Sequence, residues 1–287
     1  MKEQVTVSKP GLIETHLEAG GKTQSEVAGK AQPEIVGAIH AEVPAETPSV
    51  ERFKLVERVQ HLVLLTTFLG AAFTGMPLKY KTSWWAAPLM STYGGVWIAG
   101  RIHRFFAATM LLLSVFHLGY LAYYMLVKRI SPFKMPLFPT WNDVKQVGQN
   151  LAYFLGLRKE RPAFTKFAYY EKFDYWAVFW GIVIIGGSGL VLWFPTLATR
   201  VLPGIAVNVA LIMHSDEALL AVLAIFIWHF YNVHWNPDIF PMNWTMFTGR
   251  ISLARLKEEH RGEYQQLVED GVIRPLGGAA GHGHHDR

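Results

Sequence analysis

The chain has 287 residues, of which 51% are apolar and 14% aromatic, and its formal net charge is +5. It contains no cysteine, which excludes disulfides, iron–sulfur clusters, thiolate metal sites and covalently attached haem, since each of these needs cysteine. Long apolar stretches separate the chain from soluble proteins of this size. The basic residues follow those stretches, so they indicate membrane topology, and we expect no nucleic-acid partner.

The N-terminal segment differs in composition from the rest of the chain. Residues 1–50 are rich in Glu, Ala, Gly, Thr and Pro and show no apolar period. They also lack the basic start and apolar core of a signal peptide. We therefore expect a disordered cytoplasmic tail over residues 1–50, a transmembrane domain over 51–250, and a cytoplasmic C-terminal helix and tail over 251–287.

Four apolar stretches each reach the roughly 20 residues that cross a hydrocarbon core. The second and fourth are longer and should tilt or project beyond the bilayer. The fold class predicted is all-α: an integral membrane four-helix bundle with haem groups between the helices, plus cytoplasmic amphipathic and C-terminal helices. The predicted spans are Leu55–Met76, Val96–Val127, Tyr175–Phe194 and Ile205–Trp235.

The charges between the spans predict the orientation. Nine basic residues lie between the second and third spans, from Lys128 to Lys172, and more lie before the first span and after the fourth. The two remaining loops carry few. The excess of Lys and Arg on cytoplasmic loops places both termini and the central loop in the cytoplasm. We expect a multi-pass protein of a bacterial or archaeal cytoplasmic membrane.

Three segments outside the spans have recognisable patterns. Ser131–Thr140 holds three prolines and predicts an irregular connector. Trp141–Leu157 is apolar at helical spacing and predicts an amphipathic helix on the cytoplasmic membrane surface. Ser252–Val268 predicts a polar helix with Ser252 as its cap and with Arg255 and Glu259 as an exposed pair. The final residues, GHGHHDR, predict a frayed end.

Histidines are the most informative polar residues of the spans. The second span holds two of them 14 residues apart and the fourth holds two 15 residues apart. At 1.5 Å and 100° per residue, each pair lies on roughly one helix face, about 21 to 23 Å apart along the axis. Polar groups at such depths are functional candidates by default. The five candidates are His61, His103, His117, His214 and His229.

Alternating helices place these histidines at two depths. His103 and His214 fall at the outer level, and His61, His117 and His229 fall at the inner level. A haem with two imidazole ligands needs two histidines at equal depth on facing helices, with their nitrogens about 4 Å apart through the iron. This predicts an outer pair of His103 with His214.

The inner level leaves two alternatives open. His229 pairs with either His61 or His117, and the remaining one lines a quinone pocket or serves a third haem together with His234. His234 is rotated by about 140° from His229, so it faces elsewhere. We therefore expect two b-type haems, or three with His234.

Charged residues near the outer pair suggest further roles. Arg101 and Arg104 flank His103, and a guanidinium suits the carboxylates of haem propionates, although simple snorkelling to the interface explains them equally well. Asp216 and Glu217 follow His214 inside a span and need cationic partners. The candidates for those partners are Arg101, Arg104 and Arg200. Glycines that would let a macrocycle or another helix approach are Gly70, Gly75, Gly186, Gly187 and Gly189.

Four stretches, one per span, are similar to a known family. They are ERVQHLVLLTTFLGAAFTGMPLKY, RIHRFFAATMLLLSVFH, YYEKFDYWAVFWGIVIIGGSGLVLWFP and HSDEALLAVLAIFIWHFYNVHWNPDIFPMNWTMFTGRISLARLKEEH. Through them the chain resembles the membrane cytochrome b (gamma) subunit of respiratory formate dehydrogenases and its relatives in thiosulfate reductases and nickel–iron hydrogenases. The resemblance covers about Glu51 to Leu267 and is most specific in the fourth stretch.

The resemblance implies a subunit with two b haems that passes electrons between a quinone pool and a partner subunit. In that family the inner haem is held by the equivalents of His61 and His229, and the quinone pocket lies near them and near the start of the third helix. His117 departs from the family pattern. Its spacing is similar to that in the cytochrome b of quinol–cytochrome c oxidoreductases, which would pair it with His229.

These observations predict a transmembrane electron carrier. Quinone or menaquinone reacts near the cytoplasmic face, and single electrons cross through the haems to or from a partner with iron–sulfur or multihaem c-type groups. In this prediction the chain is the quinone-reactive subunit of an oxidoreductase complex embedded in membrane lipid. The alternative is a non-redox transporter or scaffold whose histidines relay protons or bind metal.

Overall fold

The computed structural model describes residues 48–237 and 239–276, and four of its helices are long and apolar enough to cross a membrane. The prediction of a mainly helical chain with four such helices is confirmed. The third helix begins at Tyr169, six residues before the predicted start, because the Glu171 carboxylate caps its first turn by accepting the Ala168 N–H at 2.7 Å. The four are α1 (Leu55–Lys79), α3 (Val96–Leu126), α5 (Tyr169–Trp193) and the helix Ile205–Trp235, which comprises α7 (Ile205–Leu223) and the π-helical segments η2 (Ala224–His229) and η3 (Tyr231–Trp235).

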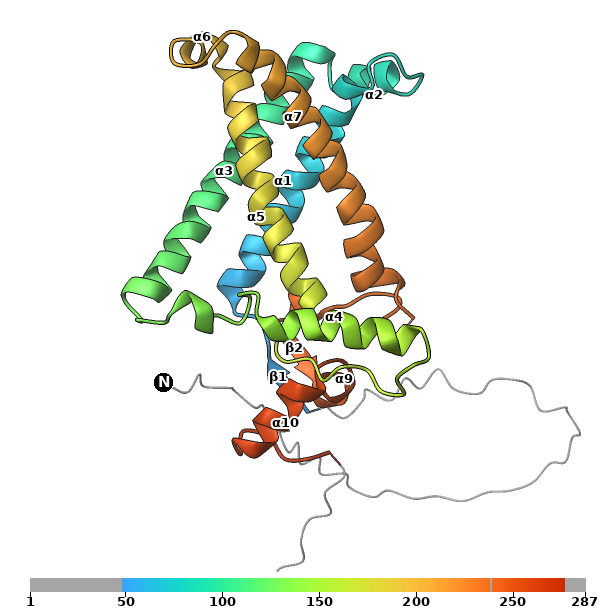
Figure 1. The fold of residues 1–287 in the computed structure, drawn as a ribbon. Helices are drawn as coiled ribbons and strands as arrows, with labels where there is room; N and C mark the ends of the chain where they lie inside the picture. The colour runs from blue at the N-terminus through green and yellow to red at the C-terminus, as the bar shows by residue number, and fades with distance from the viewer. Residues whose placement is uncertain (1–47, 238, 277–287) are drawn as a thin grey trace, which may run out of the picture.

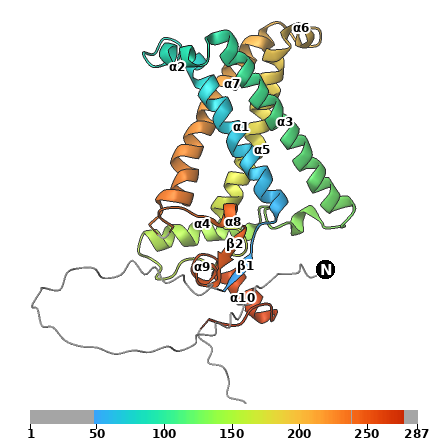
Figure 2. The ribbon, with the colours of Figure 1, turned by 180° about the vertical axis from the view of Figure 1, so that it is seen from behind.

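The four long helices alternate in direction, so α3 and α7 run parallel to each other (Figure 1). α1 packs mainly on α3, and α5 packs mainly on α7, which makes the bundle a pair of helical hairpins. Two short helices, α2 (Ala86–Thr92) and α6 (Pro195–Ala198), lie at one end of the bundle, which we term the α2 end. Seen from either side, the long helices spread apart toward the opposite end (Figure 2).

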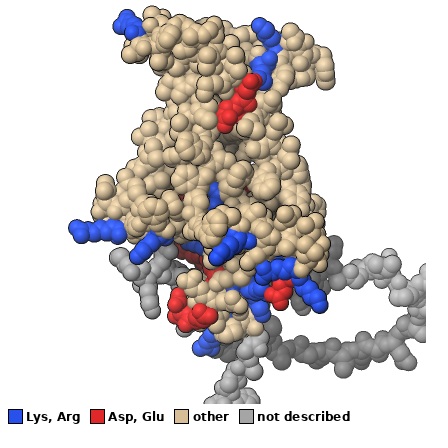
Figure 3. Space-filling model, in the orientation of Figure 1, with Lys and Arg blue, Asp and Glu red and all other residues tan. Residues whose placement is uncertain are grey.

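Hydroxyl side chains inside the long helices donate their hydrogen bonds to backbone carbonyls of their own helix. Thr67 donates to the Val63 carbonyl at 2.8 Å, and Ser114 donates to the Met110 carbonyl at 2.8 Å. Such bonds to a carbonyl of the preceding turn suit a helix surrounded by hydrocarbon, where no water is present to accept them. The flanks of the helices are covered by exposed apolar side chains, which form a wide uncharged band between the two ends (Figure 3).

Helix α4 (Trp141–Phe154) crosses the other end of the bundle, which we term the α4 end. Its buried face is polar, with Gln146 and Asn150, while its exposed face is apolar. The predicted amphipathic helix is therefore present, although it stops at Phe154 because Gly156 turns the chain with a φ of +72°. An apolar face turned away from the protein matches a helix that lies on a bilayer surface.

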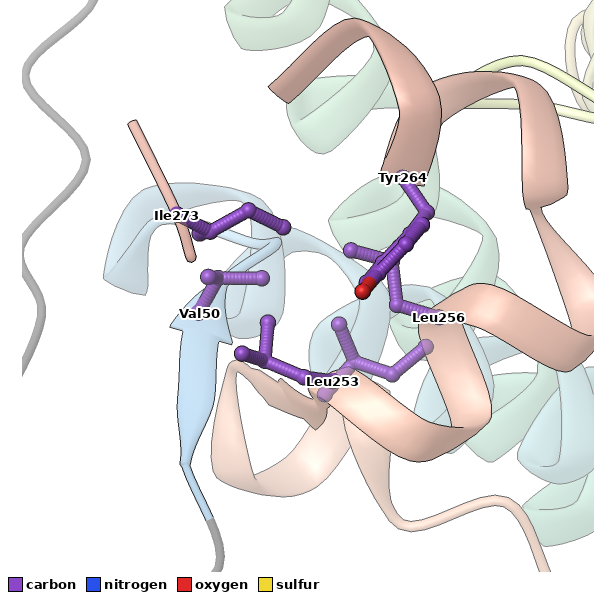
Figure 4. Close-up of a cluster of buried hydrophobic side chains, with 6 residues drawn as sticks. Val50, Leu253, Leu256, Tyr264 and Ile273 are labelled. Carbon is purple, nitrogen blue, oxygen red and sulfur yellow. The ribbon is translucent and has the colours of Figure 1, made fainter. Parts of the chain in front are cut away.

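A small module at the α4 end joins the segment before α1 to the segment after the fourth long helix. Strand β1 (Ser49–Glu51) pairs antiparallel with β2 (Arg250–Ser252), so that Val50 lies opposite Ile251. In the predicted irregular connector, the chain forms one turn of 3₁₀-helix, η1 (Pro132–Lys134). The module itself also contains α8 (Thr245–Thr248), α9 (Leu253–Glu259) and α10 (Arg261–Glu269). Its apolar core is formed by Val50, Ile251, Leu253, Leu256, Tyr264 and Ile273 (Figure 4).

Two predictions for the terminal segments differ from the structure in detail. The tail predicted to be disordered lies outside the described residues up to position 47, but Ser49 and Val50 belong to β1. The single helix predicted after Ser252 is divided into α9 and α10 at His260. The predicted cap is present, since Ser252 Oγ accepts the Arg255 N–H at 3.3 Å. Arg255 also pairs with Glu259 at 2.7 Å, but both side chains are half-buried, whereas the prediction was of an exposed pair. The GHGHHDR end lies outside the described residues.

His260 is buried in the module against the guanidinium of Arg52, which also pairs with Glu263 at 2.7 Å. The His260 Nδ1–H donates to the Thr165 carbonyl at 2.8 Å, and its Nε2 lies 2.9 Å from an Arg52 nitrogen. Because arginine has no acceptor atom, Nε2 must carry the lone pair. Burial, and then the neighbouring Arg52 charge, lower the pKa of His260 to about 3.

We expect the contribution of His260 to the module's stability to be lost as the pH falls below about 6.5, the ordinary pKa of histidine. Between pH 6.5 and 3 the unfolded chain binds a proton that the folded His260 refuses, so His260 by itself lowers the free energy of unfolding by up to about 1.4 kcal/mol per pH unit. The measurement is thermal unfolding at pH 7.5 and at pH 5.5. Unfolding of the module is detected by a fluorophore attached to Gln266→Cys, in a chain that has no other cysteine. The control His260→Gln does not titrate, so on going from pH 7.5 to 5.5 the wild type should lose more stability than the variant; equal changes in both would refute the assignment.

Candidate histidine-pair site

Two histidines face each other near the α2 end of the bundle. His103 projects from α3 and His214 from α7, and their ring centres are 6.1 Å apart with an interplanar angle of 78°. The structure thus brings together the two residues predicted to form the outer pair. We call them the α2-end pair.

A second pair lies toward the α4 end. His61 of α1 and His229 of η2 have ring centres 6.5 Å apart and an interplanar angle of 36°. Two imidazoles that point at one iron from opposite sides have their ring centres about 6 Å apart, since each metal–nitrogen bond is about 2 Å and the nitrogen lies about 1 Å from its ring centre. Both separations fit that requirement. We call His61 and His229 the α4-end pair.

Hydrogen bonds set the tautomer of both histidines in the α2-end pair. His103 Nδ1 lies 3.1 Å from the Ala71 carbonyl oxygen, and His214 Nδ1 lies 2.9 Å from the Ile185 carbonyl oxygen. A carbonyl oxygen only accepts, so the proton is on Nδ1 in each ring and the lone pair is on Nε2. Each ring therefore offers Nε2 as a metal ligand and has its other nitrogen anchored to the neighbouring helix.

His229 of the α4-end pair is anchored by a carboxylate. Its Nδ1 lies 3.1 Å from Asp174 Oδ2, and both side chains are half-buried. The carboxylate accepts the Nδ1–H, which again leaves the lone pair on Nε2. Asp174 stands at the start of α5, where Lys172 is bound by Asp143 at 2.9 Å and Glu171 faces Arg52 at 3.7 Å.

His117, the third histidine at this depth, takes part in neither pair. Its Nδ1 lies 2.8 Å from Gln60 Oε1, and its Nε2 lies 2.9 Å from the hydroxyl of Tyr175. The amide oxygen accepts the Nδ1–H, so Nε2 accepts the tyrosine proton. A hydrogen bond of 2.9 Å leaves no room for an iron between the two atoms, which would need about 4 Å. His234 packs its ring on Phe230, with ring centres 5.2 Å apart.

Glycines bring the helices of each hairpin close to the α2-end pair. A Cβ added at Gly75 would lie 3.1 Å from His103 Cε1, and one added at Gly189 would lie 3.1 Å from His214 Cε1. Both distances are tighter than a side chain normally tolerates, so each imidazole depends on the missing side chain opposite it. Gly70 and Gly186 instead admit Phe106 and Leu111.

The two hairpins use the same residue pattern around their α2-end histidines, a pattern that the spacing of histidines alone does not predict. In α1 a carbonyl at Ala71 and a hydroxyl at Thr74 approach His103 Nδ1, and the hydroxyl is 3.1 Å away. In α5 the Ile185 carbonyl and the Ser188 hydroxyl, at 3.4 Å, do the same for His214. The signal is an internal repeat: Gln60-His61 precedes Thr74-Gly75 by 14 residues, as Asp174-Tyr175 precedes Ser188-Gly189.

The π-helical segment η2 accounts for the unequal histidine spacings. His103 and His117 are 14 residues apart in the regular helix α3, whereas His214 and His229 are 15 residues apart. A π turn closes its hydrogen bond over one residue more than an α turn, so Ala224–His229 takes up the extra residue. His229 thereby faces the bundle at the depth where His61 lies. π segments occur frequently at functional sites.

Charged groups at the α2 end are arranged differently from the prediction. Asp216 pairs with Lys79, the last residue of α1, and so its partner is none of the three predicted arginines. Lys79 can reach because α1 ends beside the middle of α7, where the Lys79 Nζ also donates to the Ser215 hydroxyl at 3.1 Å. Arg101 stacks over the Trp97 ring at 4.7 Å. Together with Arg104 it lines a shallow hollow that also contains Phe105, Ala108 and Trp193.

No protein-family model matches this chain, and a comparison with curated proteins finds no match. The chemical reading of the site therefore depends on its geometry. Among the residues that the structure describes, no three His, Asp or Glu side chains gather as a site for a metal ion, and the histidines of the bundle face each other in twos.

The Tyr175 hydroxyl should contribute measurably to the stability of the bundle. Tyr175→Phe leaves the His117 acceptor unpaired in apolar surroundings, which costs about 1 kcal/mol, or about 2 to 4 °C in unfolding temperature for a chain of this size. Thermal unfolding in detergent measures this change. The matched control is Tyr231→Phe, since the exposed Tyr231 side chain has no hydrogen bond within the described part of the chain. Equal effects of both variants would show that the His117 contact is not stabilising.

Proposed function

We propose that the chain is a di-haem b-type cytochrome subunit that carries electrons across a membrane between quinone and a partner redox subunit. One observation carries the proposal: two histidine pairs, each with the ring separation of a bis-imidazole iron site, lie at opposite ends of a four-helix bundle of membrane-spanning length. The 14 or 15 residues between the levels correspond to about 21 to 23 Å along the helices.

Haem fits these pairs better than a bare metal ion does. A porphyrin supplies four nitrogens of its own and needs only two axial ligands, which is what each pair offers. A zinc ion would need three or four protein ligands at each place. Bound haem supplies one-electron chemistry, and the absence of cysteine requires that it be non-covalently held, hence b-type.

The chain's own residues position and tune the two sites. Ala71 and Ile185 hold the α2-end imidazoles through their carbonyls, and Asp174 holds His229. These contacts fix the ring orientation and keep each lone pair on Nε2. Arg101 and Arg104, at the hollow beside His103, supply guanidinium groups for the propionate carboxylates.

The α4 end is the cytoplasmic end in this proposal. Lys and Arg gather there in Figure 3, and the apolar face of α4 lies at the same level. Positive charge concentrates on the cytoplasmic side of membrane proteins, and an exposed apolar helix face binds the lipid surface. The α2 end, with few basic residues, then faces outward.

Two electrons and two protons are exchanged when a quinol becomes a quinone, whereas each histidine pair handles one electron at a time. Quinone chemistry belongs at the α4 end, where His117 and Tyr175 offer a hydrogen-bonded donor and acceptor near the α4-end pair. The partner belongs at the α2 end and must carry iron–sulfur or c-type haem groups, because this chain lacks cysteine. The protein would thus be the quinone-reactive subunit of an oxidoreductase complex.

The number of haems tests the proposal directly. Purified protein should contain two b haems per chain, as measured by pyridine haemochrome, and His103→Ala, His214→Ala, His61→Ala and His229→Ala should each lose one. The control His117→Ala should keep both, because the His117 Nε2 is occupied by Tyr175. Retention of both haems in His61→Ala, with loss of one in His117→Ala, would assign the inner ligand to His117.

A preparation that contains no haem would overturn the proposal. It would instead favour the transporter or scaffold alternative, in which the same histidines relay protons.

The place of electron entry gives a second test. Under anaerobic conditions a menaquinol analogue should reduce the b-type absorption bands of the wild-type protein. His214→Ala should keep fast reduction of its remaining haem, since the α4-end pair is intact, whereas His229→Ala should lose it. Stopped-flow absorbance measures both rates. Fast reduction in His229→Ala and slow reduction in His214→Ala would place the quinone at the α2 end.

A further inference from the structure

The two histidine pairs differ in the groups that hold their Nδ1 atoms. At the α2-end pair both acceptors are neutral carbonyls, of Ala71 and Ile185. At the α4-end pair His229 donates to the carboxylate of Asp174 at 3.1 Å. The bundle is otherwise built from two similar hairpins, so this difference in charge stands out between its two ends.

The internal repeat places a neutral amide in one hairpin where the other hairpin has a carboxylate. Gln60 in α1 and Asp174 in α5 occupy equivalent places, each 14 residues before the hydroxyl residue that approaches an α2-end histidine. Each accepts the Nδ1–H of one histidine, Gln60 that of His117 and Asp174 that of His229. The neutral amide thus serves the histidine outside the pairs, and the carboxylate serves the histidine inside one.

The carboxylate changes the electronic character of its histidine. Accepting the Nδ1–H with a negative charge makes the imidazole a more basic ligand, which stabilises the oxidised iron. Its charge also acts directly on the site, in surroundings where screening by water is weak. Asp174 is free to act on His229, because the neighbouring Lys172 is bound by Asp143 and Arg52 by Glu263 and Glu171.

The α2 end has the opposite electrostatic bias. Arg101 and Arg104 lie within a turn of His103, and both line the hollow at Trp193. Positive charge near a redox site stabilises its reduced state. Of the two carboxylates that follow His214, Asp216 is neutralised by Lys79. Glu217 offsets one of the two guanidinium charges, so the net charge around this pair stays positive.

We propose that Asp174 is a positioning residue that, through His229, gives the α4-end site the lower midpoint potential, so that electrons pass from the α4 end to the α2 end. This inference rests on the proposed haem ligation and adds a direction to it. The chain then oxidises a quinol at the α4 end and delivers electrons to an oxidised acceptor at the α2 end. The reaction that consumes its product is a reduction carried out by the partner on that face.

Spectroelectrochemical titration of the purified full-length protein tests the order of the potentials. His214→Ala leaves only the α4-end site, and its midpoint should match the lower of the two wild-type values. If it matches the higher value, the proposed direction is overturned. If the wild-type protein binds no haem, the haem assignment falls, and this inference falls with it.

The Asp174→Asn variant tests the residue itself. It should make reduction of the α4-end site at least tenfold more favourable, which is 59 mV for a one-electron couple, and should leave the other midpoint in place. Asp174→Glu, which keeps the carboxylate, should restore the low potential. Glu57→Gln is the matched control, since it removes a carboxylate four residues before His61 that caps α1 at the Lys54 N–H; its shift should be clearly smaller. An Asp174→Asn midpoint equal to that of the wild type would overturn the role of Asp174.

Discussion

The architecture depends on one constraint, that a polar ring inside an apolar bundle must have its hydrogen bonds satisfied by the protein. In each hairpin the first helix meets this requirement for the second: α1 supplies a carbonyl to His103, and α5 supplies one to His214. An unpaired donor in such surroundings would cost several kcal/mol. The same bonds that remove this cost also orient the rings, so packing within each hairpin and the geometry between hairpins are set by one set of contacts.

The division into two hairpins explains how the histidines of a small bundle can be held rigidly and still have different surroundings. Each hairpin anchors the histidines of its second helix through close helix contact, assisted by Gly75 and Gly189, which admit the rings where a side chain would collide. In His103, His214 and His229 the nitrogen without a partner inside the hairpin is Nε2. At the level of the α4-end pair, His61 of α1 and Tyr175 of α5 occupy equivalent positions in the two hairpins. His61 faces His229, whereas Tyr175 faces His117. Similar backbones thus present two different chemistries at one depth.

Much of this organisation follows from the sequence. Span length and the depth of His103 and His214 come from apolar content and helical rise, which are local properties. The alternation of helices then places these two residues together. The inner pairing could not be derived in that way, because depth alone does not distinguish His61 from His117; the resemblance to known cytochromes favoured His61. Lys79 was missed as the partner of Asp216 because it belongs to a span end whose position depends on the packing of α1 against α7. The split at His260 depends on burial against Arg52, a contact across 208 residues.

The short pairing of β1 with β2 has a consequence for the chain as a whole. It brings the residue before α1 and the residue after η3 and α8 into one antiparallel ladder, with Ser49 opposite Ser252. The path of the backbone through the bundle is therefore nearly a closed ring, in which neither hairpin is first by necessity. A circular permutant that joins the ladder covalently and opens the connection between α3 and α5 would retain the same neighbours for the histidines of the bundle, because close segments of this kind make such rearrangements compatible with a fold.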